Sequence, residues 1–98
     1  MRVSVIILNY NGARTIDNCL KSVFNSSFKD LEVIIVDNAS KDNSLDLVRK
    51  YKVKIIKNKK NYGFAEGNNI GIRKAKGKYI FLLNQDAYLD KDCLNILL

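Results

Sequence analysis

The 98-residue sequence predicts one α/β domain with a mainly parallel sheet and helices on both faces. Three apolar runs are near-continuous rather than alternating, which is typical of strands covered on both faces. Stretches with helical spacing separate these runs, so strands and helices alternate and the crossovers are expected to be right-handed. Apolar residues make up 47% of the chain, which supports a folded core and argues against disorder.

Four apolar runs are the expected strands. They lie, in chain order, at residues 3–8, 33–36, 53–56 and 79–83. The third run is the weakest. It lies inside a basic stretch, Arg49 to Lys60, which holds seven basic residues and no acid.

Helical patterns fill the connections. The first helix carries one apolar face, formed by Ile16, Cys19, Leu20, Val23 and Phe24. The second is expected to carry Leu45, Val48 and Tyr51, behind a cap from Ser40 or Asp42.

A third helix is expected from about Phe64 to Ala75, with Phe64, Asn68 and Gly71 on its apolar stripe, and Gly77 ends it. A fourth begins at Asp90 or Asp92 and presents cysteine and leucine side chains. The sequence stops within that pattern, so we expect residues 1–98 to be part of a longer protein.

The composition excludes several kinds of site. There is no histidine, which removes Ser-His-Asp and Cys-His nucleophiles. Cys19 and Cys93 lie far apart without a CxxC pair, which argues against a disulfide scaffold or a zinc site and fits a reducing compartment. Neither the dinucleotide-binding glycine pattern nor the P-loop pattern is present, and no apolar run approaches the ~20 residues of a membrane span.

Polar side chains gather where three of the expected strands end. Asn9 and Tyr10 follow the first strand, Asp37 follows the second, and Asn84 and Asp86 follow the last. In a parallel α/β sheet, ligands bind beyond the carboxyl ends of the strands. Asp37 can accept a hydrogen bond from a base N–H or a ribose hydroxyl, or it can cap the segment that follows. Tyr10 can stack on a base, or it is a partly buried aromatic residue.

Asp86 follows a fully apolar strand. A carboxylate there suits a hard divalent cation that takes oxygen ligands, and the Asn84 amide can add an oxygen. The alternative is a turn or a cap before the last helix. Farther upstream, Asn68 falls on the apolar stripe of the third helix, where an unpaired amide is costly, so it needs a backbone or ligand partner. Gly67 and Gly71 allow the same helix to approach a neighbour closely.

Four segments, at residues 3–11, 36–42, 61–71 and 77–86, resemble in order and spacing those of the family 2 glycosyltransferases, which have the GT-A fold. The resemblance covers the whole chain. It implies a three-layer, Rossmann-like half domain with the strand order 3-2-1-4. The Gly-Phe-Ala and Asn-Gln-Asp variants look most like a branch that includes rhamnosyltransferase-like members.

The resemblance implies transfer of a sugar, with inversion, from a UDP-, dTDP- or GDP-linked donor to a glycan or lipid-linked acceptor, as in cell-wall or polysaccharide biosynthesis. Asn9 and Tyr10 would line the base pocket, and Asp37 would accept from the base imide. Asn68 stands where many relatives carry an arginine. Asp86 would bind Mn²⁺ or Mg²⁺, and Asn84 replaces the first acid of the Asp-x-Asp motif. No residue matches the family's catalytic base, so we expect the chain to bind donor but to transfer little or no sugar.

The basic stretch is open to more than one interpretation. In the order 3-2-1-4 the third strand is an edge, and lysines on an edge discourage pairing with other sheets. The alternative is peripheral contact with anionic lipid at the cytoplasmic face of a membrane. Nucleic acid is not an expected partner, because aromatic residues do not interleave with the lysines. Cytoplasmic localisation and self-association are expected. A non-enzymatic α/β binding module and a nucleotidyltransferase of similar architecture are the alternative functions.

Overall fold

The computed structural model describes residues 2–98 and confirms the expected alternation of strands and helices. The strands are β1 (Val3–Asn9), β2 (Leu31–Asp37), β3 (Lys54–Lys57) and β4 (Tyr79–Asn84). The helices are α1 (Ile16–Phe24), α2 (Ser44–Val48), α3 (Gly63–Lys74) and α4 (Cys93–Leu97).

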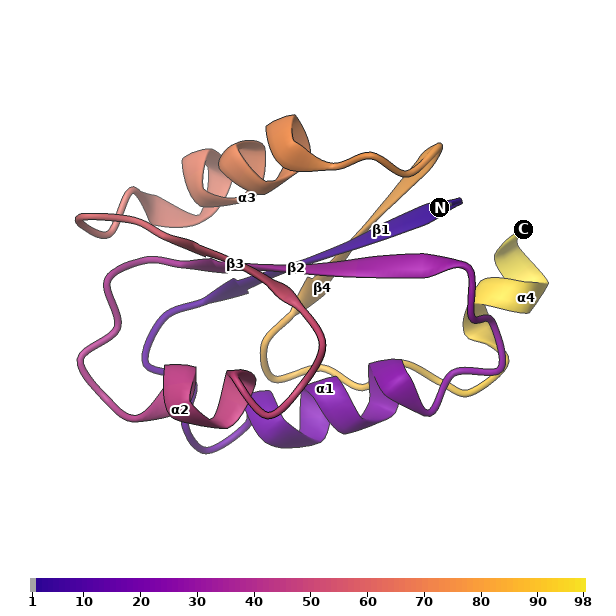
Figure 1. Ribbon diagram of the computed structural model, residues 1–98, viewed down its shortest axis with the longest axis horizontal. Coiled ribbons are helices and arrows are strands. Elements are labelled where there is room, and N and C mark those ends of the chain that lie inside the picture. The colour runs from indigo at the N-terminus through magenta and orange to yellow at the C-terminus, as the bar shows by residue number, and fades with distance from the viewer. Residues whose placement is uncertain (1) are drawn as a thin grey trace.

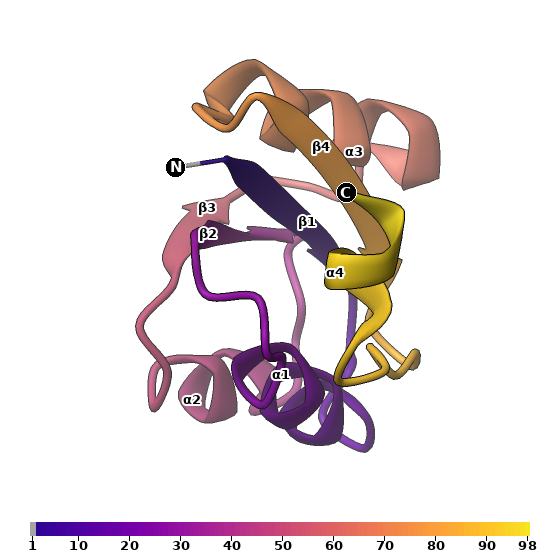
Figure 2. The ribbon, with the colours of Figure 1, turned by 90° about the vertical axis from the view of Figure 1, so that its right-hand side faces the viewer.

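The four strands form one parallel sheet in the order β3-β2-β1-β4, as predicted (Figure 1). The register places Ile6 of β1 beside Ile34 of β2 and Leu82 of β4. Helix α3 covers one face of the sheet, and α1 and α2 cover the other, which gives three layers (Figure 2). The weak third strand is an edge strand, as expected.

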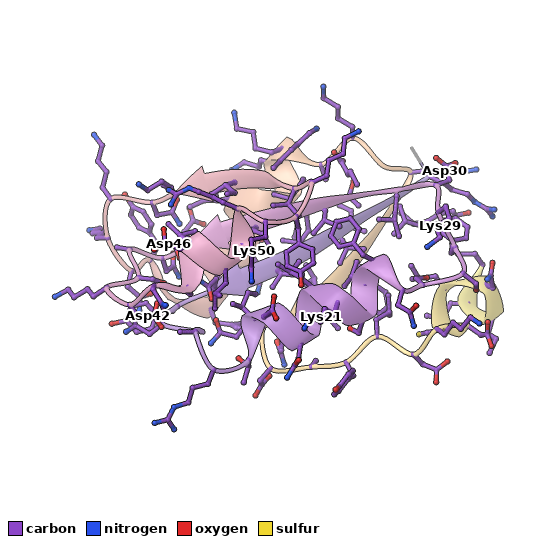
Figure 3. The ribbon with its side chains drawn as sticks, turned by 60° about the horizontal axis from the view of Figure 1, so that its bottom comes forward. Lys21, Lys29, Asp30, Asp42, Asp46 and Lys50 are labelled. Carbon is purple, nitrogen blue, oxygen red and sulfur yellow. The ribbon has the colours of Figure 1, made fainter. Side chains whose placement is uncertain are left out.

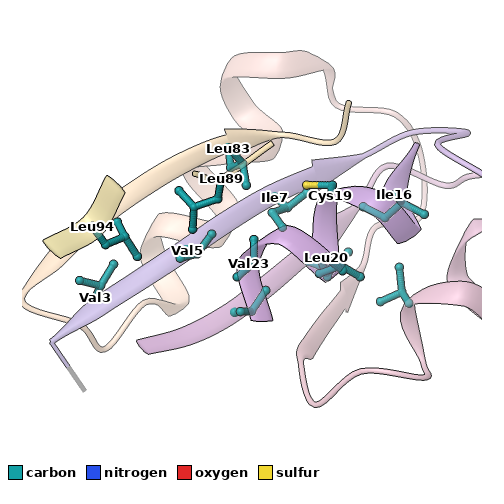
Figure 4. Packing of buried hydrophobic residues seen from close by; sticks show 13 residues of the cluster. Val3, Val5, Ile7, Ile16, Cys19, Leu20, Val23, Leu83, Leu89 and Leu94 are labelled. Carbon is teal, nitrogen blue, oxygen red and sulfur yellow. The ribbon is translucent and has the colours of Figure 1, made fainter. Parts of the chain in front are cut away.

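The larger core lies between the sheet and α1. Val5 and Ile7 of β1 meet Ile16, Leu20 and Val23 of α1, and all five side chains are fully buried (Figure 4). Four residues of the predicted apolar face of α1 are buried, whereas Phe24 is partly exposed and the polar Ser22 is buried in addition.

Close approach of α3 to the sheet depends on two glycines, as the sequence indicates. A Cβ at Gly71 would lie 2.6 Å from Ile6 Cγ2 and 2.8 Å from Val36 Cγ2. A Cβ at Gly67 would lie 2.5 Å from Leu8 Cδ1. The helix therefore rests with its backbone against β1 and β2.

The expectation that the last apolar run is covered on both faces is wrong for β4. Ile80 and Leu82 are 43% and 48% exposed. The reason is that β4 is an edge strand and α3 lies over β1 and β2, so within residues 2–98 no helix shields that face of β4. Phe64, placed on the buried stripe of α3 by its spacing, is 65% exposed.

Two helices are shorter than their patterns suggest. Helix α2 ends at Val48, so Tyr51 lies outside it and stacks on Phe24 instead, with ring centroids 5.5 Å apart. Helix α4 begins after Asp92, and Leu94 is its one buried residue. Cys93 is partly buried against the larger core, whereas Ile96 and Leu97 are exposed.

No helix in residues 2–98 is long and apolar enough to cross a membrane. Cys19 and Cys93 are both free thiols.

Candidate functional site

Three strands end side by side at the carboxyl edge of the sheet. Asn9 and Asp37, the last residues of β1 and β2, are direct neighbours in the register. Asn84, the last residue of β4, stands beside Leu8 of β1. The sheet therefore brings five of the six predicted site residues, Asn9, Tyr10, Asp37, Asn84 and Asp86, to one edge.

Asn9 and Asp37 are buried and bonded to each other. The Asn9 Nδ2 group donates to Asp37 Oδ1 at 2.8 Å and to Ser44 Oγ at 2.9 Å. Asp37 Oδ1 also accepts from Ser40 Oγ at 2.7 Å, and Oδ2 accepts from the Ser40 N–H at 3.0 Å. Asp37 thus shapes the loop before α2, and Oδ2 keeps one unused lone pair.

The amide of Asn9 has one fixed orientation, because its nitrogen faces only acceptors. Its Oδ1 atom is the buried side-chain polar atom of residues 2–98 that has no hydrogen-bond partner. That oxygen faces Gly12, where a Cβ would lie only 2.4 Å away. Asn9 therefore holds the two loops together and leaves no room for a side chain at position 12.

Further hydrogen bonds join the loops after β1 and β2. The Asn11 N–H donates to Ser40 Oγ at 2.8 Å, and the Lys41 N–H donates to Asn11 Oδ1 at 2.8 Å. The Ala13 N–H donates to Asp42 Oδ2 at 3.0 Å. Burial alone raises the pKa of Asp42, but hydrogen bonds from Ser44 and Ala13 outweigh burial and lower it. The Ser44 N–H at the start of α2 donates to Asp42 Oδ1 at 3.0 Å, but the N-cap residue is Asn43, so neither of the predicted caps, Ser40 and Asp42, occupies the cap position.

The loop after β1 is also bonded to the end of β4, through a residue that the sequence did not single out. The Tyr10 N–H donates to Gln85 Oε1 at 2.8 Å, and Gln85 Nε2 donates to the Tyr10 carbonyl at 3.2 Å. A second such residue is Asn38, which donates to the Gly63 carbonyl at 3.1 Å and accepts from Asn58 at 2.8 Å. Asn38 thereby fixes the start of α3 relative to the sheet.

Two adjoining hollows open at this edge. One, of about 330 Å³, is lined by Leu8, Tyr10, Phe64, Asn84, Gln85 and Asp86. The other, of about 490 Å³, lies between the Asn11–Thr15 loop, Asp42, Gln85 and Asp86. A third hollow, of about 500 Å³, lies by Phe24 and Val53 away from the strand ends. Its charged lining residues Glu32 and Lys54 are bonded to each other at 2.7 Å, and it does not lie at the carboxyl edge of the sheet, so the two hollows that share Asp86 form the candidate site.

Asp86 is exposed and lies where both hollows meet, with the exposed Asn84 two residues before it. Within residues 2–98 no group of three acidic or cysteine side chains could hold a metal ion. One carboxylate with an amide oxygen nearby suits Mg²⁺ or Mn²⁺ when waters and ligand phosphates complete the coordination. Asp86 and Asn84 therefore fit a divalent cation that binds together with a phosphate-containing ligand.

Cys19 lies beneath this acid. Its thiol contacts the Asn84 carbonyl at 3.5 Å, and Figure 4 shows it on the core side of α1. Burial, together with the negative charge of Asp86, raises the pKa of Cys19 to about 11. The thiol is therefore protonated at neutral pH and is a poor metal ligand.

Asn68 is the predicted site residue that does not line either hollow. It is 6% exposed, and its side chain forms no hydrogen bond within residues 2–98. Asn68 lies one turn after Phe64, which does line the smaller hollow. The sequence predicts a hydrogen-bond partner for the Asn68 amide, and no protein group within residues 2–98 provides one.

The fold and the site define the chain as a GT-A-type α/β domain with a polar, acid-containing carboxyl edge. A family model for "Glycosyl transferase family 2" matches residues 4–98, and the chain belongs to that family. It is 35% identical over 100 residues to the cholesterol galactosyltransferase of Borreliella burgdorferi, and the alignment covers 98% of this chain and 28% of that protein.

Solved structures give the same fold. Crystalline S. aureus TarS in complex with UDP-GlcNAc superposes with a TM-score of 0.95 at 29% identity, over 99% of this chain and 30% of that one. The mannosyltransferase PcManGT from Pyrobaculum calidifontis, in complex with GDP-Man and Mn²⁺, gives a TM-score of 0.89 at 28% identity, over 95% of this chain and 30% of that one. The chain spans between 10% and 39% of the length of the curated relatives compared with it.

Proposed function

We propose that this chain forms the nucleotide-sugar-binding part of an inverting glycosyltransferase that takes a UDP-, dTDP- or GDP-linked donor. The observation that carries the proposal is the meeting of Tyr10, Asn84 and Asp86 at one hollow beyond the carboxyl ends of parallel strands. The UDP-GlcNAc and GDP-Man complexes of the structural neighbours support this class of ligand.

Each predicted residue has a stated role in this proposal. The exposed ring of Tyr10 stacks on the base. The remaining lone pair of Asp37 Oδ2 accepts from the base N–H, although its 2% exposure requires the surrounding loop to open for the base. Asn9 holds Asp37 in place, and the unpaired amide of Asn68 turns toward the bound nucleotide.

Asp86, with Asn84, would hold Mn²⁺ or Mg²⁺ together with the diphosphate. A bound cation there would stabilise the negative charge that develops on the leaving nucleoside diphosphate. The presence of Mn²⁺ in the PcManGT complex supports use of a divalent cation. A glycan or lipid-linked acceptor, cytoplasmic localisation and the rhamnosyltransferase-like branch stay predictions.

The basic stretch gives limited support to membrane contact. Lys52, Lys54, Lys57, Lys59 and Lys60 are all exposed around the edge strand β3. Lys54 is paired with the buried Glu32 at 2.7 Å, so its charge is already balanced. The location of these lysines at a sheet edge favours protection against edge-to-edge pairing.

Calorimetric titration tests the proposal. UDP, dTDP and GDP are titrated with and without Mn²⁺ into the chain, into Asp86→Asn, and into the control Asp46→Asn, whose carboxylate is exposed on α2 (Figure 3). We expect Mn²⁺ to enhance binding of one diphosphate in the wild type and in the control, and the enhancement to disappear in Asp86→Asn. Absence of binding in the wild type, or an enhancement that survives in Asp86→Asn, would contradict the proposal.

A further inference from the structure

The parallel ladder between β1 and β4 ends at the Leu8–Asn84 pair, yet the two strands stay joined beyond it. The joint is made by a side chain. Gln85 accepts from the Tyr10 N–H at 2.8 Å and donates to the Tyr10 carbonyl at 3.2 Å, across 75 positions of sequence. We name these two hydrogen bonds the latch.

Only an uncharged amide can form the latch. Tyr10 offers one main-chain donor and one acceptor, and a glutamine side chain offers the complementary acceptor and donor. A carboxylate in its place could not donate to the Tyr10 carbonyl, and it would add a negative charge beside Asp86. Within residues 2–98 the Gln85 side chain forms no other hydrogen bond, so the latch accounts for all of its bonded contacts.

The neighbouring loop is shaped around this amide. A Cβ at Gly12 would lie 2.5 Å from Gln85 Oε1 and 2.9 Å from Gln85 Cδ. The Gly12 backbone therefore closes over the Gln85 side chain, and the absence of a side chain at position 12 makes room for the latch.

Gln85 also stands between the two sides of the site. Tyr10, which the latch holds, lines the smaller hollow, and Asp86 directly follows Gln85 in the chain. Gln85 and Asp86 both line the two hollows. Two hydrogen bonds therefore connect the residue that precedes Asp86 to the main chain of Tyr10.

We propose that Gln85 is a positioning residue that couples the base-binding side of the site at Tyr10 to the cation-binding side at Asp86. This inference rests on the proposed function, since it assigns Tyr10 to the base and Asp86 to the cation. Binding of Mn²⁺ at Asp86 then holds the Tyr10 main chain in its base-binding position, and binding of the nucleotide raises the affinity for Mn²⁺ by the same factor.

The first experiment examines the latch without any ligand. Amide hydrogen exchange is measured by NMR in the wild type, in Gln85→Met, and in Asn18→Met, which replaces an exposed amide on α1. Methionine has a similar length but cannot form either bond. We expect exchange at the Tyr10 N–H to be about tenfold or more faster in Gln85→Met and unchanged in the control. A Tyr10 N–H that exchanges at the unprotected rate in the wild type would overturn the latch.

The second experiment measures the coupling. The coupling is measured as a ratio: the dissociation constant of the bound nucleoside diphosphate without Mn²⁺, divided by its dissociation constant with Mn²⁺. Couplings between sites are typically about 5- to 150-fold, and we expect a ratio in that range for the wild type. Gln85→Met should lower the ratio at least about fivefold, because methionine can neither accept from the Tyr10 N–H nor donate to the Tyr10 carbonyl.

A residue that only stabilises the fold would weaken both dissociation constants equally and leave their ratio unchanged, and that result would overturn the coupling. If the wild type binds no nucleoside diphosphate at all, the proposed function fails and the coupling fails with it. The exchange rate at Tyr10 then still decides whether the latch forms, so the two failures are distinguishable.

Discussion

Replacement of Glu32 by glutamine is expected to lower the free energy of unfolding by about 2 kcal/mol at pH 7 and to remove the part of its acid dependence that Glu32 supplies. Glu32 lies on β2 at the end of the sheet opposite the site, and its side chain is 5% exposed. Its carboxylate accepts hydrogen bonds from Lys54 Nζ at 2.7 Å, from the Lys76 N–H at 2.7 Å and from Ser4 Oγ. It therefore joins β1, β2, β3 and the connection before β4.

The magnitude follows from the pKa of this group. Burial by itself raises the pKa of Glu32, but the hydrogen bonds from Lys54, Ser4 and Lys76 outweigh burial and lower the pKa from 4.5 to about 2. A difference of about 2.5 pKa units corresponds to about 3 kcal/mol, at 1.36 kcal/mol per unit. Because the Lys54 side chain is 46% exposed, solvent screens part of this interaction, and about 2 kcal/mol is expected.

The sign of the pH dependence is fixed by the direction of the shift. A carboxyl group with a lower pKa in the folded state stabilises the fold fully above its unfolded pKa, near 4.5. This stabilisation is lost as the pH falls through the folded value, about 2. The difference between the wild type and Glu32→Gln should therefore be constant from pH 7 to about pH 5 and shrink toward zero near pH 2.

Urea denaturation followed by circular dichroism, repeated between pH 7 and pH 2, measures this difference. The control is Glu66→Gln, which breaks the exposed pair of Glu66 and Arg73 on α3 and is expected to change stability by less than about 1 kcal/mol. Equal stability of the wild type and Glu32→Gln at pH 7 would refute the reasoning. A difference that persists at pH 2 would refute it as well, because it would arise from packing rather than from ionisation.

Two glycine substitutions test the close contacts around the sheet. Gly71→Ala places a Cβ 2.6 Å from Ile6 Cγ2 and 2.8 Å from Val36 Cγ2. The β-branched side chains of Ile6 and Val36 cannot move aside, so overpacking should cost about 1–3 kcal/mol. This cost should exceed the gain of about 1 kcal/mol in helix propensity. Urea denaturation should thus show a destabilised variant, and a more stable one would contradict the packing of α3. Gly12→Ala places a Cβ 2.4 Å from Asn9 Oδ1 and 2.5 Å from Gln85 Oε1, so it should open the latch and raise exchange at the Tyr10 N–H at least as much as Gln85→Met does. Unchanged exchange in Gly12→Ala would show that the loop does not close over the Gln85 amide.

The strands and helices themselves could be predicted because the relevant forces are local to each segment, whereas the strand order 3-2-1-4 came from the family resemblance. Near-continuous apolar runs define β1 and β2, and the helical spacing of Ile16 to Phe24 defines α1. The same pattern was misleading for β4. An apolar run indicates that burial of a strand is favourable, but the tertiary arrangement decides which element buries it. Here α3 packs over β1 and β2 rather than over β4.

The site divides in the same way. Placement of Asn9, Asp37 and Asp86 at one edge follows from strand direction alone, since the carboxyl ends of parallel strands share an edge. The contacts of Gln85 could not be read from the sequence, because its partner Tyr10 lies 75 positions away and the bond goes to main-chain atoms. Because every residue except proline carries the same main-chain N–H and carbonyl groups, the sequence does not reveal which of them a side chain will bond. The signals that could have been used are the amide between Asn84 and Asp86 and the glycine at position 12.

The distribution of charge at the carboxyl edge gives a reason for cation dependence that is independent of the family. The carboxylates of Asp37 and Asp42 accept hydrogen bonds from the protein, whereas Asp86 forms none within residues 2–98. A diphosphate in the larger hollow would lie beside Asp42 and Asp86. The negative charges of the diphosphate and of the two carboxylates would then repel one another. A divalent cation at Asp86 reverses the sign of that interaction. The asparagine of Asp86→Asn removes one of the repelling charges, so without Mn²⁺ this variant should bind the diphosphate at least as tightly as the wild type, although Mn²⁺ no longer improves its binding.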